Sequence, residues 1–298
     1  MPKAKPPVMA YAGRTVVVGA GTMGVRVALR CARQGVETAL VARDLERARA
    51  RLLDAAAEIH DERSAGEVVL TTDLAAVARA GVVYEAIPES LGRKQVLFQE
   101  IEAFVGDEVP LVSGTSTFFP EALGRLLEFP KRVFVAHFVH PVTLVALAEI
   151  AAPAEAGVEA GAVFEAWIAA AGLRPLRLPT PLPGYVVNRL QFALLREALH
   201  IVESGGATAE QVDAVMRLGL GPRWTATGPL ESVALGGKAT FADVARALVP
   251  TLDARPAIPL LEGPDDSRLG GGEDFGAALS ARLHAYRAAA EIAVQRER

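Results

Sequence analysis

The chain has 298 residues, of which 51% are hydrophobic, and its formal net charge is −4. That length suits about two domains, and no basic tract beyond the opening MPKAKPP offers a surface to nucleic acid or anionic membranes. The single cysteine, Cys31, excludes an internal disulfide, and no apolar stretch reaches the roughly 18 residues of a membrane helix. We therefore expect a cytoplasmic protein with no nucleic-acid or membrane partner, and no metal site is expected.

Strand-like and helix-like stretches alternate over the first 182 residues. The expected strands lie at residues 14–18, 36–42, 68–70, 82–87, 109–114, 132–138, 144–150 and 173–179. Helices are expected over residues 23–34, 44–63 and 157–172, with further helical stretches between most of the other strands. Such alternation predicts an α/β fold in which helices cover a mainly parallel sheet, that is, a Rossmann-type doubly wound domain over residues 1–182.

The stretch PTPLPGY at residues 179–185 is the clearest break in the chain, and strand signals vanish beyond it. The segment GYVVNRLQFALLREALHIVESGG has apolar residues at helical spacing over about five turns. Thr208, followed three residues later by Gln211, has the spacing of a capping box. We expect an all-α C-terminal domain over residues 183–298, with a loop near LEGPDDSRLGGGED.

A glycine-rich loop follows the first expected strand and precedes the first expected helix. It reads GAGTMG and places Gly19, Gly21, Thr22, Met23 and Gly24 at a strand–helix turn. The first two glycines permit a tight turn and a close approach to a pyrophosphate, and the third permits close helix–strand packing. The helix N-terminus adds a field that favours phosphate. In this context the motif predicts dinucleotide binding rather than a plain tight turn.

The end of the second expected strand bears on the choice of coenzyme. An acidic residue there would bind the ribose 2′-hydroxyl of NAD, but this chain has Ala42 followed by Arg43. An alanine beside an arginine tolerates or clamps a 2′-phosphate, so NADP(H) is favoured and NAD(H) stays possible. Asp44, one residue later, either replaces the missing acid or caps the next helix.

A histidine and a glutamate lie in two apolar runs, RVFVAHF and LVALAEI, joined by VHPVT. If the runs pair antiparallel around a turn near Thr143, His137 faces Glu149. A carboxylate on one ring nitrogen fixes the tautomer and leaves the other nitrogen to exchange a proton with an alcohol or carbonyl oxygen. On spacing alone, a structural buried pair explains the two residues equally well.

Six motifs in order resemble the 3-hydroxyacyl-CoA dehydrogenase family, including its lambda-crystallin and carnitine-dehydrogenase branch. They are GAGTMG (19–24), EAIPESLGRK (85–94), SGTS (113–116), HFVHP (137–141) with Glu149, PGYVVNR (183–189) and GP-x-E (228–231). The resemblance implies that His137 and Glu149 form the catalytic dyad. It also implies a homodimer built through the helical C-terminal domain.

The same resemblance assigns roles to four further residues. Ser116 and Asn188 match positions that orient the substrate oxygens. Glu89 and Lys94 match positions that contact the nicotinamide ribose side of the coenzyme.

The chain departs from the family at His140, where the family's HF-x-N-P motif carries asparagine. A histidine either replaces the amide in binding a substrate oxygen or simply lines the pocket. The segment AAAEIHDERSAGE is short and mostly acidic where the acyl-CoA enzymes have a long helical hairpin with a basic surface. This favours a substrate without CoA, unless CoA binds elsewhere.

The stretch GLGPRWTATGP (219–229) resembles the branch that acts on small hydroxy acids. Arg223 either clamps a substrate carboxylate in a bidentate fork or lies in solvent at a helix end. Trp224 is expected to serve packing.

The expected function is therefore an NAD(P)-dependent dehydrogenase or reductase. Its substrate is a small 3-hydroxy or 3-oxo acid or an acyl thioester. A first alternative is an enzyme like the β-hydroxyacid dehydrogenases or imine reductases, which place a lysine on a long interdomain helix where this chain has none. A second is a non-catalytic dinucleotide-binding protein, as lambda-crystallin illustrates.

Overall fold

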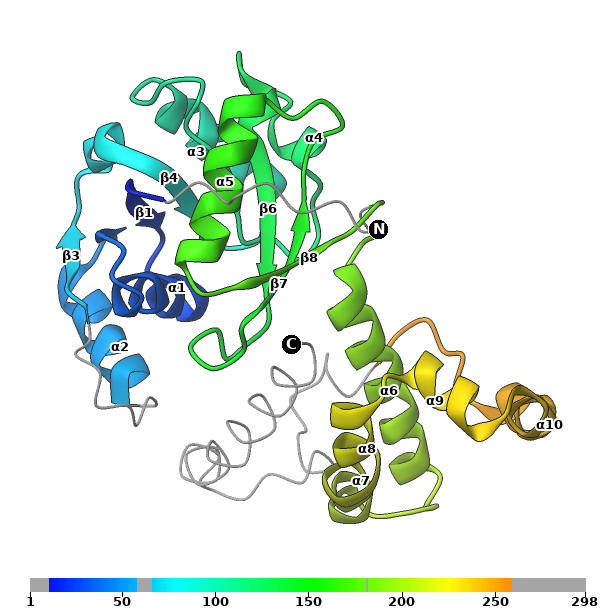
Figure 1. Cartoon of the computed structure of the whole chain (residues 1–298). Helices are drawn as coiled ribbons and strands as arrows, with labels where there is room; N and C mark the ends of the chain where they lie inside the picture. Colours follow the sequence, from blue (N-terminus) through cyan, green and yellow to red (C-terminus); the bar gives the residue numbers. More distant parts are fainter. Residues whose placement is uncertain (1–10, 58–65, 181, 259–298) are drawn as a thin grey trace. The chain divides into compact units, whose positions relative to one another are not determined.

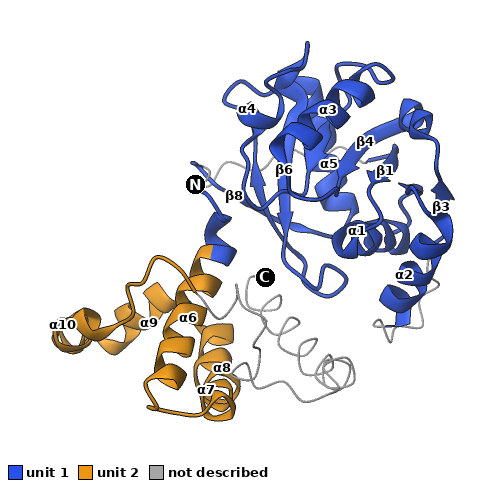
Figure 2. Ribbon diagram, turned by 180° about the vertical axis from the view of Figure 1, so that it is seen from behind, with its two compact units in different colours: residues 1–188 blue, residues 189–298 orange. Residues whose placement is uncertain are grey.

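The computed structural model describes residues 11–57, 66–180 and 182–258. The chain divides into two compact units, residues 1–188 and 189–298, which Figure 2 shows in blue and orange. The sequence placed the division a few residues earlier, between residues 182 and 183.

The first unit is built on one eight-stranded sheet with the strand order β3-β2-β1-β4-β5-β6-β7-β8. Its strands are β1 (Arg14–Val18), β2 (Thr38–Val41), β3 (Val68–Thr71), β4 (Ala80–Glu85), β5 (Leu111–Ser113), β6 (Val133–Phe138), β7 (Leu147–Ala151) and β8 (Arg174–Arg177). All neighbours are parallel except β6 and β7. Each expected strand is present, although β7 begins three residues later than expected because residues 141–146 form the turn that precedes it.

Helices lie on both faces of this sheet (Figure 1). They are α1 (Thr22–Arg33), α2 (Leu45–Ala57), α3 (Leu91–Glu102), α4 (Pro120–Leu123) and α5 (Val158–Ala170), with 3-10 turns η1 (Leu74–Arg79) and η2 (Pro130–Arg132). Apolar residues of α1 and α5 pack in one core cluster, and those of α3, α4 and η1 pack in the other. The expected doubly wound α/β class is confirmed.

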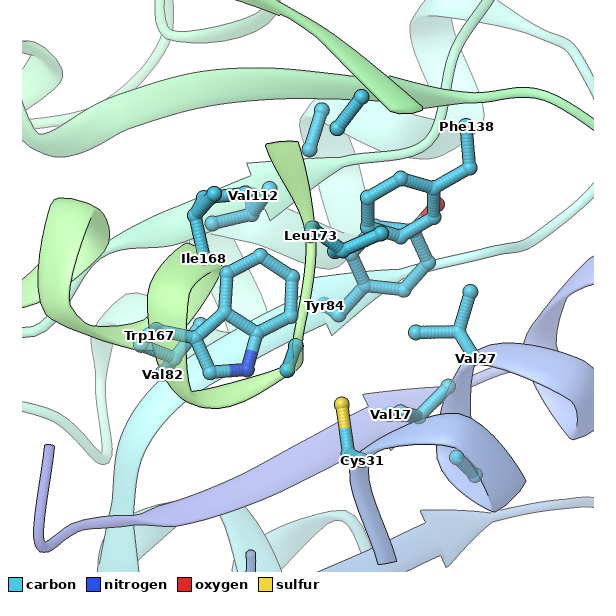
Figure 3. Packing of buried hydrophobic residues seen from close by; sticks show 14 of the residues in the cluster. Val17, Val27, Cys31, Val82, Tyr84, Val112, Phe138, Trp167, Ile168 and Leu173 are labelled. Atoms are coloured by element: carbon cyan, nitrogen blue, oxygen red, sulfur yellow. The ribbon is translucent and has the colours of Figure 1, made fainter. Parts of the chain in front are cut away.

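Alternate residues of each central strand supply the two cores, as the two-residue period of a strand requires. On β6, Phe134 and Phe138 belong to the first core, while Val133 and Val135 belong to the second. The rings of Tyr84, Phe138 and Trp167 meet in the first core beside the buried thiol of Cys31 (Figure 3). His137 therefore lies on the face of the second core.

The second unit is helical throughout its described part. Its helices are α6 (Tyr185–Glu203), which begins in the first unit, α7 (Ala209–Val215), α8 (Gly221–Ala226), α9 (Pro229–Gly236) and α10 (Lys238–Leu248), with a π-helical turn η3 (Met216–Leu220) and a 3-10 turn η4 (Val249–Thr251). The capping box of Thr208 and Gln211 is confirmed. The π-helical turn was not foreseen.

Three expectations fall outside the described residues. They are the end of the helix expected to reach residue 63, the loop expected at 261–274 and the helical tail to residue 298. None of the helices in the described ranges is both long and apolar enough to cross a membrane.

Candidate active site

The glycine loop has the geometry of a phosphate cradle. Gly19 has φ +110°, and a Cβ there would lie 2.7 Å from the carbonyl oxygen of Ala86. A Cβ on Gly24 would lie 1.8 Å from the carbonyl oxygen of Gly19, so the start of α1 packs directly on the strand. By contrast, the nearest atom to a Cβ on Gly21 is 3.9 Å away. Gly21 thus has room for a methyl group at ordinary van der Waals distance, at the N-terminus of α1, where no side chain caps the helix.

This geometry fits the pyrophosphate of a dinucleotide coenzyme. Thr22 and Met23 form the first turn of α1, where backbone N–H groups point out of the helix. The sheet order reverses between β1 and β4, and a doubly wound sheet binds its ligand at the carboxyl edge of that point.

The loop after β2 holds the residues expected to read the adenosine ribose. Ala42 is buried and its N–H donates to the carbonyl of Thr71 at 2.9 Å. Arg43 is exposed. Asp44 caps α2, since its carboxylate accepts from the backbone N–H of Arg47 at 2.9 Å. Of the two interpretations of Asp44, the structure therefore contains the cap.

His137 lies directly opposite Glu149 in the antiparallel pair of β6 and β7. The Nδ1 of His137 is 2.9 Å from Oε2 of Glu149, and both side chains are buried. The turn between them centres where the sequence placed it, and it contains a cis His140–Pro141 bond.

The N-terminus of α6 holds the carboxylate of Glu149. Backbone N–H groups of Val186 and Val187 donate to Oε1 at 2.9 and 3.2 Å. Both hydrogen bonds and the positive end of the helix dipole hold the carboxylate in place. An ionised Glu149 is an acceptor only, so the Nδ1 of His137 carries the proton and donates it.

Tyr185 packs against the other side of this pair, a contact that the sequence did not reveal. Its ring stacks on the imidazole of His137 with the centroids 5.0 Å apart, and its hydroxyl donates to the carbonyl of Phe118 at 3.1 Å. Tyr185 has φ 52°, a strained conformation for an aromatic residue, and is fully buried. A tyrosine directly after Pro-Gly at the start of a helix was the only local signal.

Asn188 lies one turn along the same helix, where its side-chain Nδ2 is 3.4 Å from Nε2 of His137. Ser116 is half-buried, and its backbone carbonyl accepts from the N–H of Gly184 at 3.1 Å. The structure thus brings Ser116 and Asn188 to the loop and helix that flank the His137–Glu149 pair. His140 is an exposed residue of the turn between β6 and β7, and Arg223 is an exposed residue of α8 in the second unit.

A buried ionic cluster closes the carboxyl end of β4. The ammonium of Lys94 is 2.7 Å from Oε1 of Glu85 and 3.2 Å from Oε2 of Glu89. The hydroxyl of Ser113 donates to Glu85 at 2.5 Å, and that of Thr115 donates to Glu89. Lys94 is 1% exposed and also donates to the carbonyl of Ile87, so its donors are directed into the protein. Glu85 and Thr115 were not foreseen, because their roles depend on contacts between separate strands.

Within the described parts of the chain, no group of three or more His, Cys, Asp or Glu residues could hold a metal ion.

A glycine cradle, a doubly wound sheet and a buried His–Glu pair near the carboxyl edge of that sheet define a nicotinamide-dependent oxidoreductase. The comparisons with known proteins place it further. Residues 14–178 match the model of the 3-hydroxyacyl-CoA dehydrogenase NAD binding domain, and residues 184–267 match that of its C-terminal domain. The chain belongs to the 3-hydroxyacyl-CoA dehydrogenase family.

Several characterised relatives cover most of the chain. The 5-formyl-3-hydroxy-2-methylpyridine 4-carboxylate 5-dehydrogenase of Mesorhizobium japonicum is 30% identical over 85% of this chain and 86% of its own length. The L-carnitine dehydrogenase of Streptomyces coelicolor is 31% identical over 84% and 82%. The human lambda-crystallin homolog is 31% identical over 76% of each chain.

Solved structures agree with this placement. A 5-formyl-3-hydroxy-2-methylpyridine 4-carboxylic acid 5-dehydrogenase, described as an NAD⁺-dependent dismutase, is 26% identical over 97% of this chain and 98% of its own, with a TM-score of 0.75. The (S)-3-hydroxybutyryl-CoA dehydrogenase of Ralstonia eutropha is 26% identical over 70% and 78%, with a TM-score of 0.62.

Gly21 and Gly24, the second and third glycines of the loop, should respond differently to an added methyl group. We expect Gly21→Ala to keep the thermal stability of the parent chain but to weaken coenzyme binding at least about tenfold, because its Cβ enters the open space of the cradle. Gly24→Ala should instead lower the melting temperature, because its Cβ meets the backbone of Gly19. Calorimetric melting and coenzyme titration of both variants check this. Equal behaviour of the two variants would contradict the assignment of the cradle.

Breaking the buried ion pair should be costly. Lys94→Met leaves two carboxylates unpaired and should lower the free energy of unfolding by about 3–5 kcal/mol, whereas Glu85→Gln together with Lys94→Met should recover part of this loss. Lys131→Met, which removes an exposed ion pair with Glu155, should leave the stability nearly unchanged. Urea unfolding followed by Trp167 fluorescence in a Trp224→Phe background measures all three. A Lys94→Met variant as stable as Lys131→Met would show that the cluster contributes little.

Proposed function

We propose that this protein interconverts a 3-hydroxy and a 3-oxo acid or acyl thioester, with His137 as the general acid and base. The observation that carries the proposal is the chain of contacts from the N-terminus of α6 through Glu149 to Nδ1 of His137, which leaves Nε2 turned toward Asn188.

The proposed mechanism uses the two ring nitrogens of His137 separately. A nicotinamide coenzyme bound at the glycine loop would supply the hydride transfer to and from the carbinol carbon. Nε2 of His137 takes the hydroxyl proton as the carbonyl forms, and the resulting imidazolium is stabilised by Glu149 at 2.9 Å from Nδ1. In the reductive direction the same Nε2 returns the proton to the oxygen.

Ser116 and Asn188 are proposed to orient the reacting oxygen. The amide of Asn188 already lies near Nε2 of His137, so an oxygen bound between them would be within hydrogen-bonding reach of both. Ser116 comes from the loop after β5, whose carbonyl holds the N–H of Gly184 just before α6. The substrate-side roles of His140 and Arg223 stay predictions from the sequence.

The names of the relatives support a hydroxy acid or its thioester as the substrate class. By their names, L-carnitine dehydrogenases act on L-carnitine, and 3-hydroxybutyryl-CoA dehydrogenases act on the CoA thioester of 3-hydroxybutyrate. The β-hydroxyacid dehydrogenase alternative is disfavoured because α6 carries no lysine along its length and presents Asn188 instead. The crystallin-like alternative, a protein without catalysis, is left to the test of His137 below.

For the coenzyme we propose a preference for NADP(H), which goes beyond the family's description as NAD binding. The support is local: Ala42 occupies the position of the ribose-reading acid, Asp44 is engaged as the cap of α2, and Arg43 is exposed beside them. Against it stands the NAD⁺ dependence of the similar solved dehydrogenase.

We propose further that the chain forms a homodimer through its helical unit. That unit exposes large apolar side chains on η3 and α9, with Leu218 82% exposed, Leu230 86% and Leu235 72%. Large apolar side chains with this exposure on one unit favour an interface there.

Removing the ring of His137 should abolish turnover without affecting the nucleotide site. For His137→Gln we expect kcat to fall by about 10²- to 10⁴-fold, with coenzyme affinity within about twofold of the parent chain. Glu149→Gln should also lose activity, because an amide offers its own donor to Nδ1. Steady-state assays with L-carnitine, 3-hydroxybutyrate and 3-hydroxybutyryl-CoA test this. Undiminished turnover in His137→Gln would exclude the mechanism, and coenzyme binding with no turnover of any hydroxy acid by the parent chain would favour the crystallin-like alternative.

Arg43 should control the response to the 2′-phosphate. We expect NADPH to bind at least about tenfold more tightly than NADH, and Arg43→Ala to remove that difference. Arg49→Ala, at an exposed residue of the following helix α2, serves as the control. Calorimetric titration of both coenzymes measures this preference. Tighter binding of NADH by the parent chain would contradict it and would indicate that Asp44 binds the ribose 2′-hydroxyl.

Association should depend on the helical unit. We expect the parent chain to have the mass of a dimer by light scattering, and Leu230→Glu combined with Leu235→Glu to shift it to a monomer. Val158→Glu, at an 83% exposed apolar residue of the first unit, should not. A monomeric parent chain would contradict the proposal.

A further inference from the structure

A coenzyme that extends from the glycine cradle to His137 passes the ionic cluster of Glu85, Glu89 and Lys94. The glycine cradle follows β1, and the sheet order then runs β4, β5, β6, with His137 near the carboxyl end of β6. Three strand spacings of about 4.8 Å separate the cradle from His137. A dinucleotide held by the cradle with its reacting ring at His137 therefore passes the ends of β4 and β5. Glu89 and Thr115 lie in the loops that follow these two strands.

The cluster at the ends of these strands carries one more negative than positive charge. Lys94 is the single cation between the carboxylates of Glu85 and Glu89. Glu85 is fully buried and receives hydrogen bonds from Lys94, Ser113 and the N–H of Ile87. Glu89 has a side chain that is 38% exposed. The remaining negative charge is thus presented to the coenzyme by Glu89.

The contacts of Glu89 keep it charged and in place. Partial burial opposes ionisation, but the hydroxyl of Thr115 and the ammonium of Lys94 prevail and hold the pKa of Glu89 below its usual value. Thr115 also accepts from the N–H groups of Thr117 and Phe118, so the carboxylate is tied to the loop that carries Ser116.

We propose that Glu89, held by Lys94 and Thr115, makes the site discriminate between the oxidation states of the coenzyme. The nicotinamide ring is cationic when oxidised and neutral when reduced, and a fixed carboxylate beside its path stabilises only the cationic form. Tighter binding of the oxidised coenzyme favours the bound equilibrium that yields the hydroxy acid. Lys94 acts in this scheme as a positioning residue through Glu89, without touching the coenzyme. The inference rests on the proposed function.

The test is calorimetric titration of NAD⁺, NADH and ADP-ribose, which share the same adenosine end, so that the 2′-phosphate question does not enter. We expect Glu89→Gln to raise the ratio of the Kd for NAD⁺ to the Kd for NADH by about tenfold, with the Kd for ADP-ribose within about twofold of the parent value. Glu89→Asp should keep the parent ratio because it keeps the charge. Glu100→Gln, at an exposed carboxylate of α3, should also leave it unchanged.

The parent chain provides a second measurement that needs no variant. Raising the ionic strength from about 0.05 to about 0.5 M should increase the same ratio, because salt screens a half-exposed charge, while common effects on the pyrophosphate cancel. An unchanged ratio in Glu89→Gln, or an equal loss of ADP-ribose binding, would overturn the inference and leave the proposed function standing. Failure of the parent chain to bind any of the three ligands, and NADPH as well, would overturn the proposed function itself.

Discussion

The site depends on one interaction, the capture of the Glu149 carboxylate by the N-terminus of α6. A buried carboxylate without partners would be costly, but here two backbone N–H groups and the helix dipole compensate for the lost water. Because the carboxylate of Glu149 already accepts from these N–H groups, the histidine opposite it is held with Nδ1 as the donor. The same helix delivers Tyr185 to the face of the imidazole and Asn188 to its free nitrogen. One helix start therefore fixes the geometry of the pair.

The sheet supplies the other half of the arrangement. Parallel strands bring the loops after β1, β4 and β5 to a single edge, and the one antiparallel pair places His137 and Glu149 side by side near that edge. The cradle then binds one end of a dinucleotide while the His–Glu pair lies three strands away. Glu85, Lys94 and Glu89 form an ionic cluster after β4, between the strands that carry the two, and Thr115 connects this cluster to the loop of Ser116.

Much of this was predictable from local patterns. The β-branched runs gave the strands, GAGTMG gave the cradle, and the twelve-residue spacing around Thr143 gave the register of His137 with Glu149. Tyr185 and Glu85 were not found, since neither has a local pattern that points to its partner. Tyr185 meets His137 across 48 residues of chain, and Glu85 meets Ser113 across 28. Lys94 was expected to contact the coenzyme, yet its ammonium is buried between the carboxylates of Glu85 and Glu89. The sequence motif does not show that Lys94 is buried.

The tautomer of His137 is the most direct test of the central claim, that Glu149 fixes the imidazole with its proton on Nδ1. Nitrogen-15 NMR of histidine-labelled protein, with His137 assigned by its loss in His137→Gln, reports each ring nitrogen separately. Neutral His137 should show a protonated Nδ1 and a bare Nε2, while Glu149→Gln should lose this preference. A proton on Nε2 in the parent chain would contradict the claim, because Nε2 could not then accept a proton from an alcohol.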